Sequence, residues 1–251
     1  MNQRATTDRR VASPKEVAAQ IRRALNDGGS AEHAAGVQWF FKDDIKSHGW
    51  YTAALRRAAV GFRREVREEH GLDFLINVAD QLFSGSILEE KVAAVFLLEK
   101  LDSEFRDREF KLFDSWLDRI GSWADHDALV HYLIGPTIAS KPARVKIVFR
   151  WAKSSNRWRR RAACVALIRG ARAQMFFSEI IGLSDFLLVD EDDMVLKGLG
   201  WLLRETAKFD ANRTVPYLMR IRGRAPRLVL RTACETLPVA LRKKILARKA
   251  A

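Results

Sequence analysis

The stretch DDMVLKGLGWLLRETAK, residues 192–208, decides the fold class. Its apolar residues recur at the spacing of one helix face. A second stripe at helical spacing mixes an indole with cations: Lys197, Trp201, Arg204 and Lys208. The acidic run at 190–193 favours a helix N-terminal cap over a metal site, because carboxylates there accept the amide hydrogens of the first turn. Gly198 and Gly200 follow no predicted strand, so they favour close helix packing over a dinucleotide-binding loop.

Helical periodicity extends outward from this stretch over almost the whole chain, and convincing strand alternation is nearly absent. Ser13 and Pro14 begin a helix in the favoured order of cap and proline, and residues 26–29 end it. Further helices are predicted at 38–41, 52–69, 73–83, 87–101, 104–120, 123–133, 143–153, 158–169, 173–181, 192–208, 215–222 and 238–250.

Helices that arrive in pairs predict an all-α fold in which HEAT-like helix-pair repeats stack into a curved solenoid, an α-α superhelix. An irregular helical bundle is the alternative. We expect a flexible leader over residues 1–13 and a single helical repeat domain over 14–251, because no long linker divides the chain.

The chain carries 44 Lys and Arg against 31 Asp and Glu, a formal net charge of +13. Such an excess indicates a polyanionic partner, and nucleic acid is the commonest one. An anionic membrane surface and a generally basic soluble protein are the alternatives that charge alone leaves open.

The sequence has no pattern typical of a disulfide framework, a metal site or a cofactor site. Cys164 and Cys234 lie far apart in predicted helices, and the five histidines are scattered. Residues 1–13 lack the apolar core of a signal peptide, and no apolar stretch reaches the about 18 residues of a membrane span. We therefore expect a cytoplasmic protein that uses neither metal nor cofactor.

Two further stretches bring charged and aromatic side chains together at helical spacing. Trp123 and Asp127 are four residues apart and share a helix face, with His131 one turn further on. Asn156 resembles an N-cap, and in the helix that follows it Arg157 and Arg161 share a face. Each feature alone has a simpler interpretation, as a packing tryptophan, a solvated carboxylate or a solvated arginine run. Together with the stripe in 192–208 they favour a nucleic-acid groove, in which cations contact phosphates and aromatic faces contact sugars or bases.

At these stretches the sequence resembles the AlkD-like family of DNA alkylation repair proteins, the HEAT-like alkylpurine DNA glycosylases. The resemblance spans about residues 38–208 and rests on Trp39-Phe40-Phe41-Lys42 with Gly49-Trp50-Tyr51-Thr52 and Leu55-Arg56-Arg57, on Trp123-x₃-Asp127 running to Gly135, on Ser155-Asn156-x-Trp158-x₂-Arg161-Ala162-Ala163, and on Lys197-x₂-Gly200-Trp201-x₂-Arg204-Glu205. The last two motifs are specific in order and spacing. The chain departs from the family pattern where Ser122 and Ala124 flank the first tryptophan, and where Phe40 replaces an expected tyrosine.

The resemblance implies a role for each matching residue. The catalytic set around the lesion would be Trp123, Asp127, Arg161 and Trp201. Side chains expected to contact DNA are Arg157, Lys197, Arg204, Lys208, Arg56, Arg57 and Phe40. The expected partner is duplex DNA that contains alkylated purines, and no membrane or obligate protein partner is implied, so we expect a monomer.

The implied reaction is hydrolysis of the N-glycosidic bond of a cationic N3- or N7-alkylated purine, in base excision repair. Such a purine is already charged, so its bond to C1′ is weakened and its departure needs little protonation. Asp127 would stabilise the oxocarbenium-like sugar, the two tryptophans would pack against it, and Arg161 would hold a backbone phosphate. The resemblance also implies that the lesion stays near the duplex. The alternative is a non-catalytic nucleic-acid binder or scaffold, against which Asp127 argues, because a carboxylate that faces phosphates weakens binding.

Overall fold

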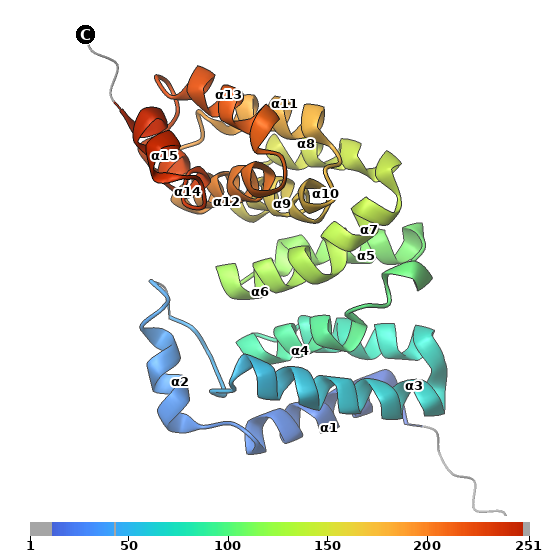
Figure 1. The fold of residues 1–251 in the computed structure, drawn as a ribbon. Coiled ribbons are helices and arrows are strands. Elements are labelled where there is room, and N and C mark those ends of the chain that lie inside the picture. Colours follow the sequence, from blue (N-terminus) through green and yellow to red (C-terminus); the bar gives the residue numbers. More distant parts are fainter. Residues whose placement is uncertain (1–11, 43, 248–251) are drawn as a thin grey trace, which may run out of the picture. The chain divides into compact units, whose positions relative to one another are not determined.

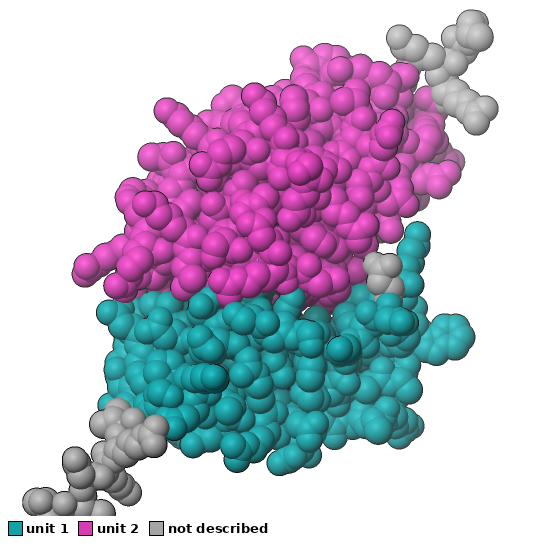
Figure 2. All heavy atoms as spheres, turned by 180° about the vertical axis from the view of Figure 1, so that it is seen from behind, with its two compact units in different colours: residues 1–98 teal, residues 99–251 magenta. Residues whose placement is uncertain are grey.

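The computed structural model describes residues 12–42 and 44–247, and these form helices and connecting turns without any strand (Figure 1). The all-α fold of helix pairs predicted from the sequence is confirmed. The chain divides into two compact units, residues 1–98 and 99–251 (Figure 2). None of the helices formed by the described residues is both long and apolar enough to cross a membrane.

The first unit is built on α3 (Thr52–Phe83) and α4 (Leu88–Leu98), which follow each other through a tight turn and pack side by side (Figure 1). Its other helices are α1 (Pro14–Asp27) and α2 (Ala31–Gln38). α3 packs against α4 and α1. Gly71 interrupts α3 with φ +80, a backbone conformation that glycine adopts without steric cost, so the two helices predicted at 52–69 and 73–83 lie end to end across a kink.

The predicted leader ends where this unit begins to fold. Ser13 is the N-cap of α1 and forms a capping box with Glu16, as the order of serine and proline predicted. Residues 1–11 lie outside the described residues, and a single domain over 14–251 stays a prediction.

The second unit stacks shorter helices, two of which are joined by a π turn. Its elements are η1 (Asp102–Glu104), α5 (Asp107–Trp116), η2 (Leu117–Arg119), α6 (Trp123–Leu129), the π turn η3 (Val130–Ile134), α7 (Gly135–Ser140), η4 (Pro142–Lys146), α8 (Ile147–Ala152), α9 (Arg157–Val165), α10 (Ile168–Arg172), α11 (Phe177–Leu187), α12 (Asp193–Phe209), α13 (Ala211–Ile221), α14 (Arg227–Ala233) and α15 (Val239–Leu246).

α12 is the central helix of this unit, because it packs against α9, α10, α13 and α14. Asp192 is its N-cap and accepts hydrogen bonds from the amides of Met194 and Val195, which confirms the capping role predicted for the acidic run. A Cβ on Gly200 would lie 2.7 Å from the Cβ of Thr232, so this glycine permits the close approach of α14. Close helix packing at this position is therefore confirmed.

Several predicted elements are wrong, each for a local reason. The helix predicted at 38–41 lies instead at 31–38; it buries no residue, so no apolar period marks it, and Ser30 caps it through the amide of His33. α14 was not predicted, because its seven residues are too few to show a clear period. The helix predicted from 173 begins at Phe177, because Gln174 and Phe176 have positive φ and break the chain direction.

Candidate active site

The first turn of α6 is fixed by its own capping box. The carboxylate of Asp125 is buried and accepts hydrogen bonds from the amides of Gly121 at 2.8 Å and Ser122 at 2.7 Å. It also accepts a hydrogen bond from the Ser122 hydroxyl. Asp125 thus satisfies the free donors at the helix start, and it holds the turn from which Trp123 and Asp127 project.

Asp127 is bound in a two-pronged ion pair with Arg161 of α9. The Arg161 Nε donates to Oδ1 at 2.9 Å, and an Arg161 terminal nitrogen donates to Oδ2 at 2.7 Å. The Asp127 side chain is 19% exposed, whereas the Arg161 side chain is 7% exposed. The Asp127 side chain therefore keeps some exposed surface, while the arginine side chain that holds it is enclosed.

Arg161 is itself held by α12. Its second terminal nitrogen donates to the carbonyl of Met194 at 2.6 Å. Gly198 lies under the arginine stem: a Cβ there would be 3.2 Å from the Arg161 Cγ. The resemblance implies a phosphate as a partner of Arg161, which stays a prediction; within the protein its partners are a carboxylate and a carbonyl, and its side chain is buried.

His126, the residue before Asp127, is also part of the cluster and was missed by sequence reasoning. Its side chain is fully buried, its Nδ1 lies 2.7 Å from the Asp127 Oδ1, and its Nε2 lies 3.0 Å from the Trp158 carbonyl. Burial would raise the pKa of Asp127, but the hydrogen bonds from His126 and Arg161, with the charge of Arg161, outweigh it and lower that pKa. Asp127 is therefore ionised at neutral pH.

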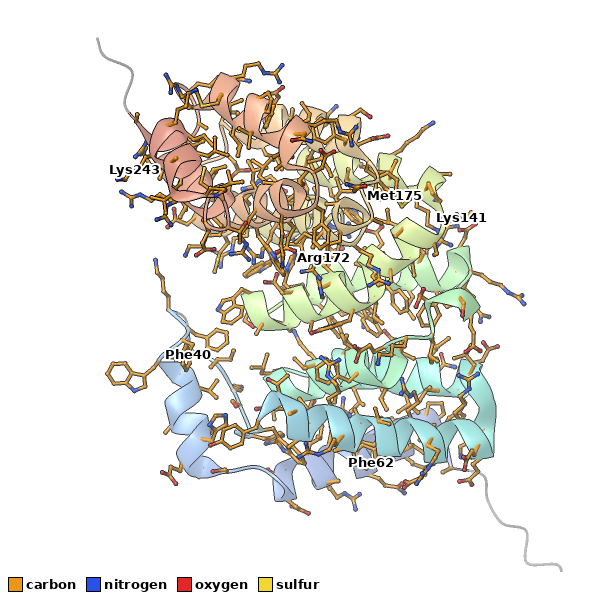
Figure 3. All side chains as sticks on the ribbon, viewed as in Figure 1. Phe40, Phe62, Lys141, Arg172, Met175 and Lys243 are labelled. Carbon is orange, nitrogen blue, oxygen red and sulfur yellow. The ribbon has the colours of Figure 1, made fainter. Side chains whose placement is uncertain are left out.

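Trp201 lies on α12 and contacts the π turn η3, which directly follows the helix that carries Asp127. Its indole stacks on the imidazole of His131, with ring centroids 5.7 Å apart and planes at 23°. His131 follows Asp127 by four residues and belongs to the π turn η3. Burial, and then the charge of Arg172, lower the pKa of His131, so its ring is neutral at neutral pH. Arg172, labelled in Figure 3, donates to Glu205 of α12 at 2.8 Å. Trp201 thus stacks on the uncharged ring of His131, and His131 lies one helical turn after Asp127.

The second unit therefore contains one partly exposed, ionised carboxylate that two cationic or donor side chains hold in place. Trp123 precedes it by one turn, and His131, on which the Trp201 indole stacks, follows it by one turn. The sequence profile of the family described as "DNA alkylation repair enzyme" matches residues 21–237 of the chain. The chain belongs to the DNA alkylation repair enzyme family.

A solved structure supports the fold assigned to this family member. The structure described as "Predicted DNA alkylation repair enzyme from Enterococcus faecalis" superimposes with a TM-score of 0.74 at 17% sequence identity, and the match covers 84% of this chain and 97% of that one. A search of curated protein sequences gives no significant match.

The cations of the second unit that were predicted to contact the DNA differ in how open they are. Lys197 and Lys208 are exposed on α12. Arg157 lies 4.6 Å above the Trp158 ring and 3.7 Å from a carboxylate oxygen of Asp192. Arg204 is ion-paired with both Glu205 and Glu235, so it is less open than its place in the stripe predicted.

The predicted DNA contacts of the first unit also differ. Phe40, labelled in Figure 3, is 77% exposed, and Arg57 is exposed on α3. Arg56 is half-buried, with its guanidinium 4.1 Å from the centroid of the Phe96 ring. Arg56 therefore has a packing role in this unit, whereas Phe40 and Arg57 present open surface.

The arginine run that begins α9 is a hub of ion pairs within the second unit. Arg159 pairs with Asp114 and Asp118, each at 2.7 Å, and Arg160 pairs with Asp190 at 2.7 Å. With the pair of Arg161, the three consecutive arginines reach α5 and η2, the loop before α12, and α6, because successive helical residues point about 100° apart. The solvated face that was the simpler interpretation of this run is therefore wrong.

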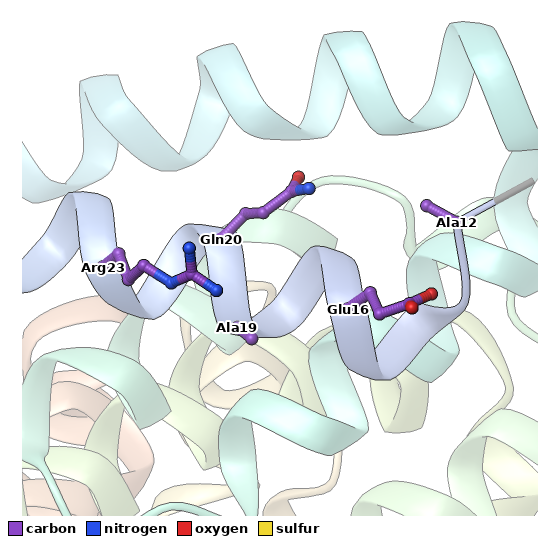
Figure 4. Close-up of a pocket in the computed structure, with 5 residues that line it drawn as sticks. All are labelled: Ala12, Glu16, Ala19, Gln20 and Arg23. Atoms are coloured by element: carbon purple, nitrogen blue, oxygen red, sulfur yellow. The ribbon is translucent and has the colours of Figure 1, made fainter.

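Neither a metal site nor the surface pocket of the first unit offers a second candidate active site among the described residues. Within the described ranges, no group of three or more His, Cys, Asp or Glu side chains could hold a metal ion, in line with the capping role of the acidic run. A surface pocket on α1, lined by Ala12, Glu16, Ala19, Gln20 and Arg23, lies in the first unit and contains none of the residues of the Asp127 cluster (Figure 4).

Proposed function

We propose that the protein is a DNA glycosylase that excises cationic N3- or N7-alkylated purines from duplex DNA, the activity implied by the resemblance. The observation that carries this proposal is Asp127: an ionised, partly exposed acid one turn from Trp123, in a member of a DNA alkylation repair family. An enzyme that acts on chromosomal DNA would work in the cytoplasm, at the nucleoid, and we propose that it does so as a monomer.

The proposed reaction needs only water as co-substrate. The bond between C1′ and the purine nitrogen breaks, and its electron pair stays on the purine and cancels the positive charge there. C1′ is left as an oxocarbenium-like cation, to which water adds and then loses a proton, giving an abasic sugar and the free base. The positive charge therefore moves from the base to the sugar, and a fixed negative charge near the sugar lowers the barrier.

Asp127 suits electrostatic stabilisation better than proton abstraction. Its lowered pKa keeps it ionised, but it also makes the carboxylate a weak base at neutral pH. The attacking water becomes acidic once it bonds to the cationic carbon, so a weak base is sufficient. Trp123 and Trp201 would place aromatic faces near the cationic sugar, each contributing about 0.5–2 kcal/mol.

In this proposal Arg161 is a positioning residue. Its two hydrogen bonds fix the plane of the Asp127 carboxylate, and its third bond, to the Met194 carbonyl, ties that plane to α12. The phosphate contact implied by the resemblance stays a prediction, and it would use the donor hydrogens of Arg161 that the three bonds leave over.

The second candidate is a DNA-binding protein without catalysis. It is favoured by one observation: a carboxylate that accepts from an arginine and a histidine also resembles an ion pair that only joins α6 to α9. The two candidates differ in what happens when the carboxylate is neutralised.

The test is release of 3-methyladenine or 7-methylguanine from methylated duplex DNA. Asp127→Asn keeps the shape of the side chain and removes its charge, so excision should fall by about 10² or more while affinity for undamaged DNA stays the same or rises. Asp190→Asn is the matched control, because it neutralises the acid that pairs with the neighbouring Arg160. It should lose stability but keep excision. Equal excision by the wild type and Asp127→Asn, or no excision by the wild type, would refute the proposal.

A further inference from the structure

His126 contacts Asp127 but is not one of the residues that carry the family resemblance. Its side chain has no exposed surface, and both of its ring nitrogens have a partner within 3.0 Å. The two partners lie on different elements, since Asp127 belongs to α6 and Trp158 to α9. The imidazole therefore spans the same two helices as the ion pair between Asp127 and Arg161.

Donor counting fixes what this imidazole does. The Trp158 carbonyl can only accept a hydrogen bond, so Nε2 must carry a hydrogen. An ionised Asp127 can also only accept, so Nδ1 must carry one as well. Both nitrogens are then donors, and the ring is an imidazolium. The other groups that act on this pair are Arg161 from α9, bonded to the carboxylate, and His131 from η3, one turn along the chain.

We propose that His126, as an imidazolium, is a positioning residue that orients and ionises the partly exposed Asp127 carboxylate. With Arg161 it holds the carboxylate oxygens by three donors, and two of these converge on Oδ1. Among the described residues Oδ2 accepts from Arg161 alone, so it is the oxygen with more lone-pair capacity left to face the sugar. This assignment rests on the proposed glycosylase function for its effect on rate, but its effect on the carboxylate does not depend on that function.

Two isosteric substitutions separate the contacts of His126. In His126→Asn the amide nitrogen occupies the place of Nδ1 and can still donate to Asp127, while the bond to Trp158 is lost. In His126→Gln the amide nitrogen occupies the place of Nε2 and can donate to the Trp158 carbonyl, while the bond to Asp127 is lost. His126→Leu removes both donors. Each of the first two variants loses one hydrogen bond, so general damage to the fold should be similar in both.

The first measurement is single-turnover excision, together with affinity for undamaged duplex and thermal unfolding. We expect His126→Asn to keep its rate within about threefold of the wild type, and His126→Gln and His126→Leu to lose about tenfold or more, with unchanged affinity. Rates that follow thermal stability, or equal rates for the Asn and Gln variants, would overturn the positioning role.

The second measurement is independent of catalysis. The carboxyl carbon of Asp127, labelled with ¹³C and assigned by its loss in Asp127→Asn, is titrated by NMR in the full-length protein. Its midpoint should rise in all three variants, least in His126→Asn, which keeps the hydrogen bond and loses only the positive charge, and more in His126→Gln and His126→Leu, which lose both. A midpoint that does not move in any variant refutes the role of His126. If the midpoints move as expected but the wild type excises no base, only the proposed function fails.

Discussion

Gly198→Ala is expected to separate stability from activity, because its two effects act on different parts of the molecule. Gly198 lies inside α12, where alanine is favoured over glycine by about 1 kcal/mol. The added Cβ would lie 3.2 Å from the Arg161 Cγ and 3.5 Å from one of its terminal nitrogens. Contacts this short require Arg161 to move by a few tenths of an ångström.

The magnitude follows from these two terms. Crowding a packed site costs about 1–3 kcal/mol, and the gain of about 1 kcal/mol in helix propensity leaves a net loss of about 0–2 kcal/mol, so the melting temperature should fall by no more than about 8 °C. Arg161 cannot move without disturbing a bond to Asp127 or to Met194. Because a misplacement of about 1 Å can cost about 10²-fold in rate, a shift of a few tenths should cost about threefold to tenfold in excision.

Two other glycines provide matched controls on helices of the same unit. A Cβ on Gly182 of α11 would meet only Phe149 atoms at 3.8 and 3.9 Å, so Gly182→Ala should raise stability and keep full excision. Gly200→Ala places a Cβ 2.7 Å from Thr232, so it should lower stability clearly. The assay is single-turnover base release with thermal unfolding on all three variants. Full excision by Gly198→Ala, or an equal loss in Gly182→Ala, would refute the role of Arg161.

The remaining predictions concern salt, acid, chelators and substrate charge. Lys197→Ala should reduce the slope of log K against log salt for duplex binding by about 0.9 if Lys197 contacts a phosphate, whereas Arg160→Ala should leave the slope unchanged and lower the melting temperature, because Arg160 is already paired with Asp190. The pKa of Asp127 is lower in the folded than in the unfolded chain, so its contribution to stability is complete above about pH 4 and is lost as pH falls through the folded value; Asp127→Asn should flatten the acid side of a stability-against-pH curve, and an unchanged curve would contradict this. Excision should survive EDTA, and uracil should be a poor substrate because its leaving group is not charged in advance; chelator-sensitive turnover or efficient uracil release would count against the mechanism.

Local signals in the sequence were sufficient to predict the helices that frame the site. Asp192 begins α12 and Asn156 begins α9 because each side-chain oxygen accepts from an amide two residues later, and such caps depend on neighbours in sequence. The one-turn spacing of Trp123 and Asp127 holds for the same reason, since both lie on α6.

Partners of charged side chains could not be predicted in the same way. Arg161 meets Asp127 across 34 positions and Arg159 meets Asp114 across 45, so their pairing depends on how α5, α6 and α9 pack. In sequence, Arg159, Arg160 and Arg161 form one basic run, and only the packed unit shows that acids neutralise each of them. His126 gave no signal for a related reason: its Trp158 partner is a backbone carbonyl, which every residue possesses.

The π turn η3 makes the number of residues in this region part of the site. Gly135 donates to the carbonyl of Val130, five positions back, so the turn holds one residue more than an α-helical turn would. Deleting one residue from 130–134 would let α6 and α7 join as one regular helix. That same deletion would rotate α6 by about 100° against α7 and carry Asp127 away from Arg161. A deletion here is therefore expected to break the pair between Asp127 and Arg161, as a substitution of either residue would, although both side chains are retained.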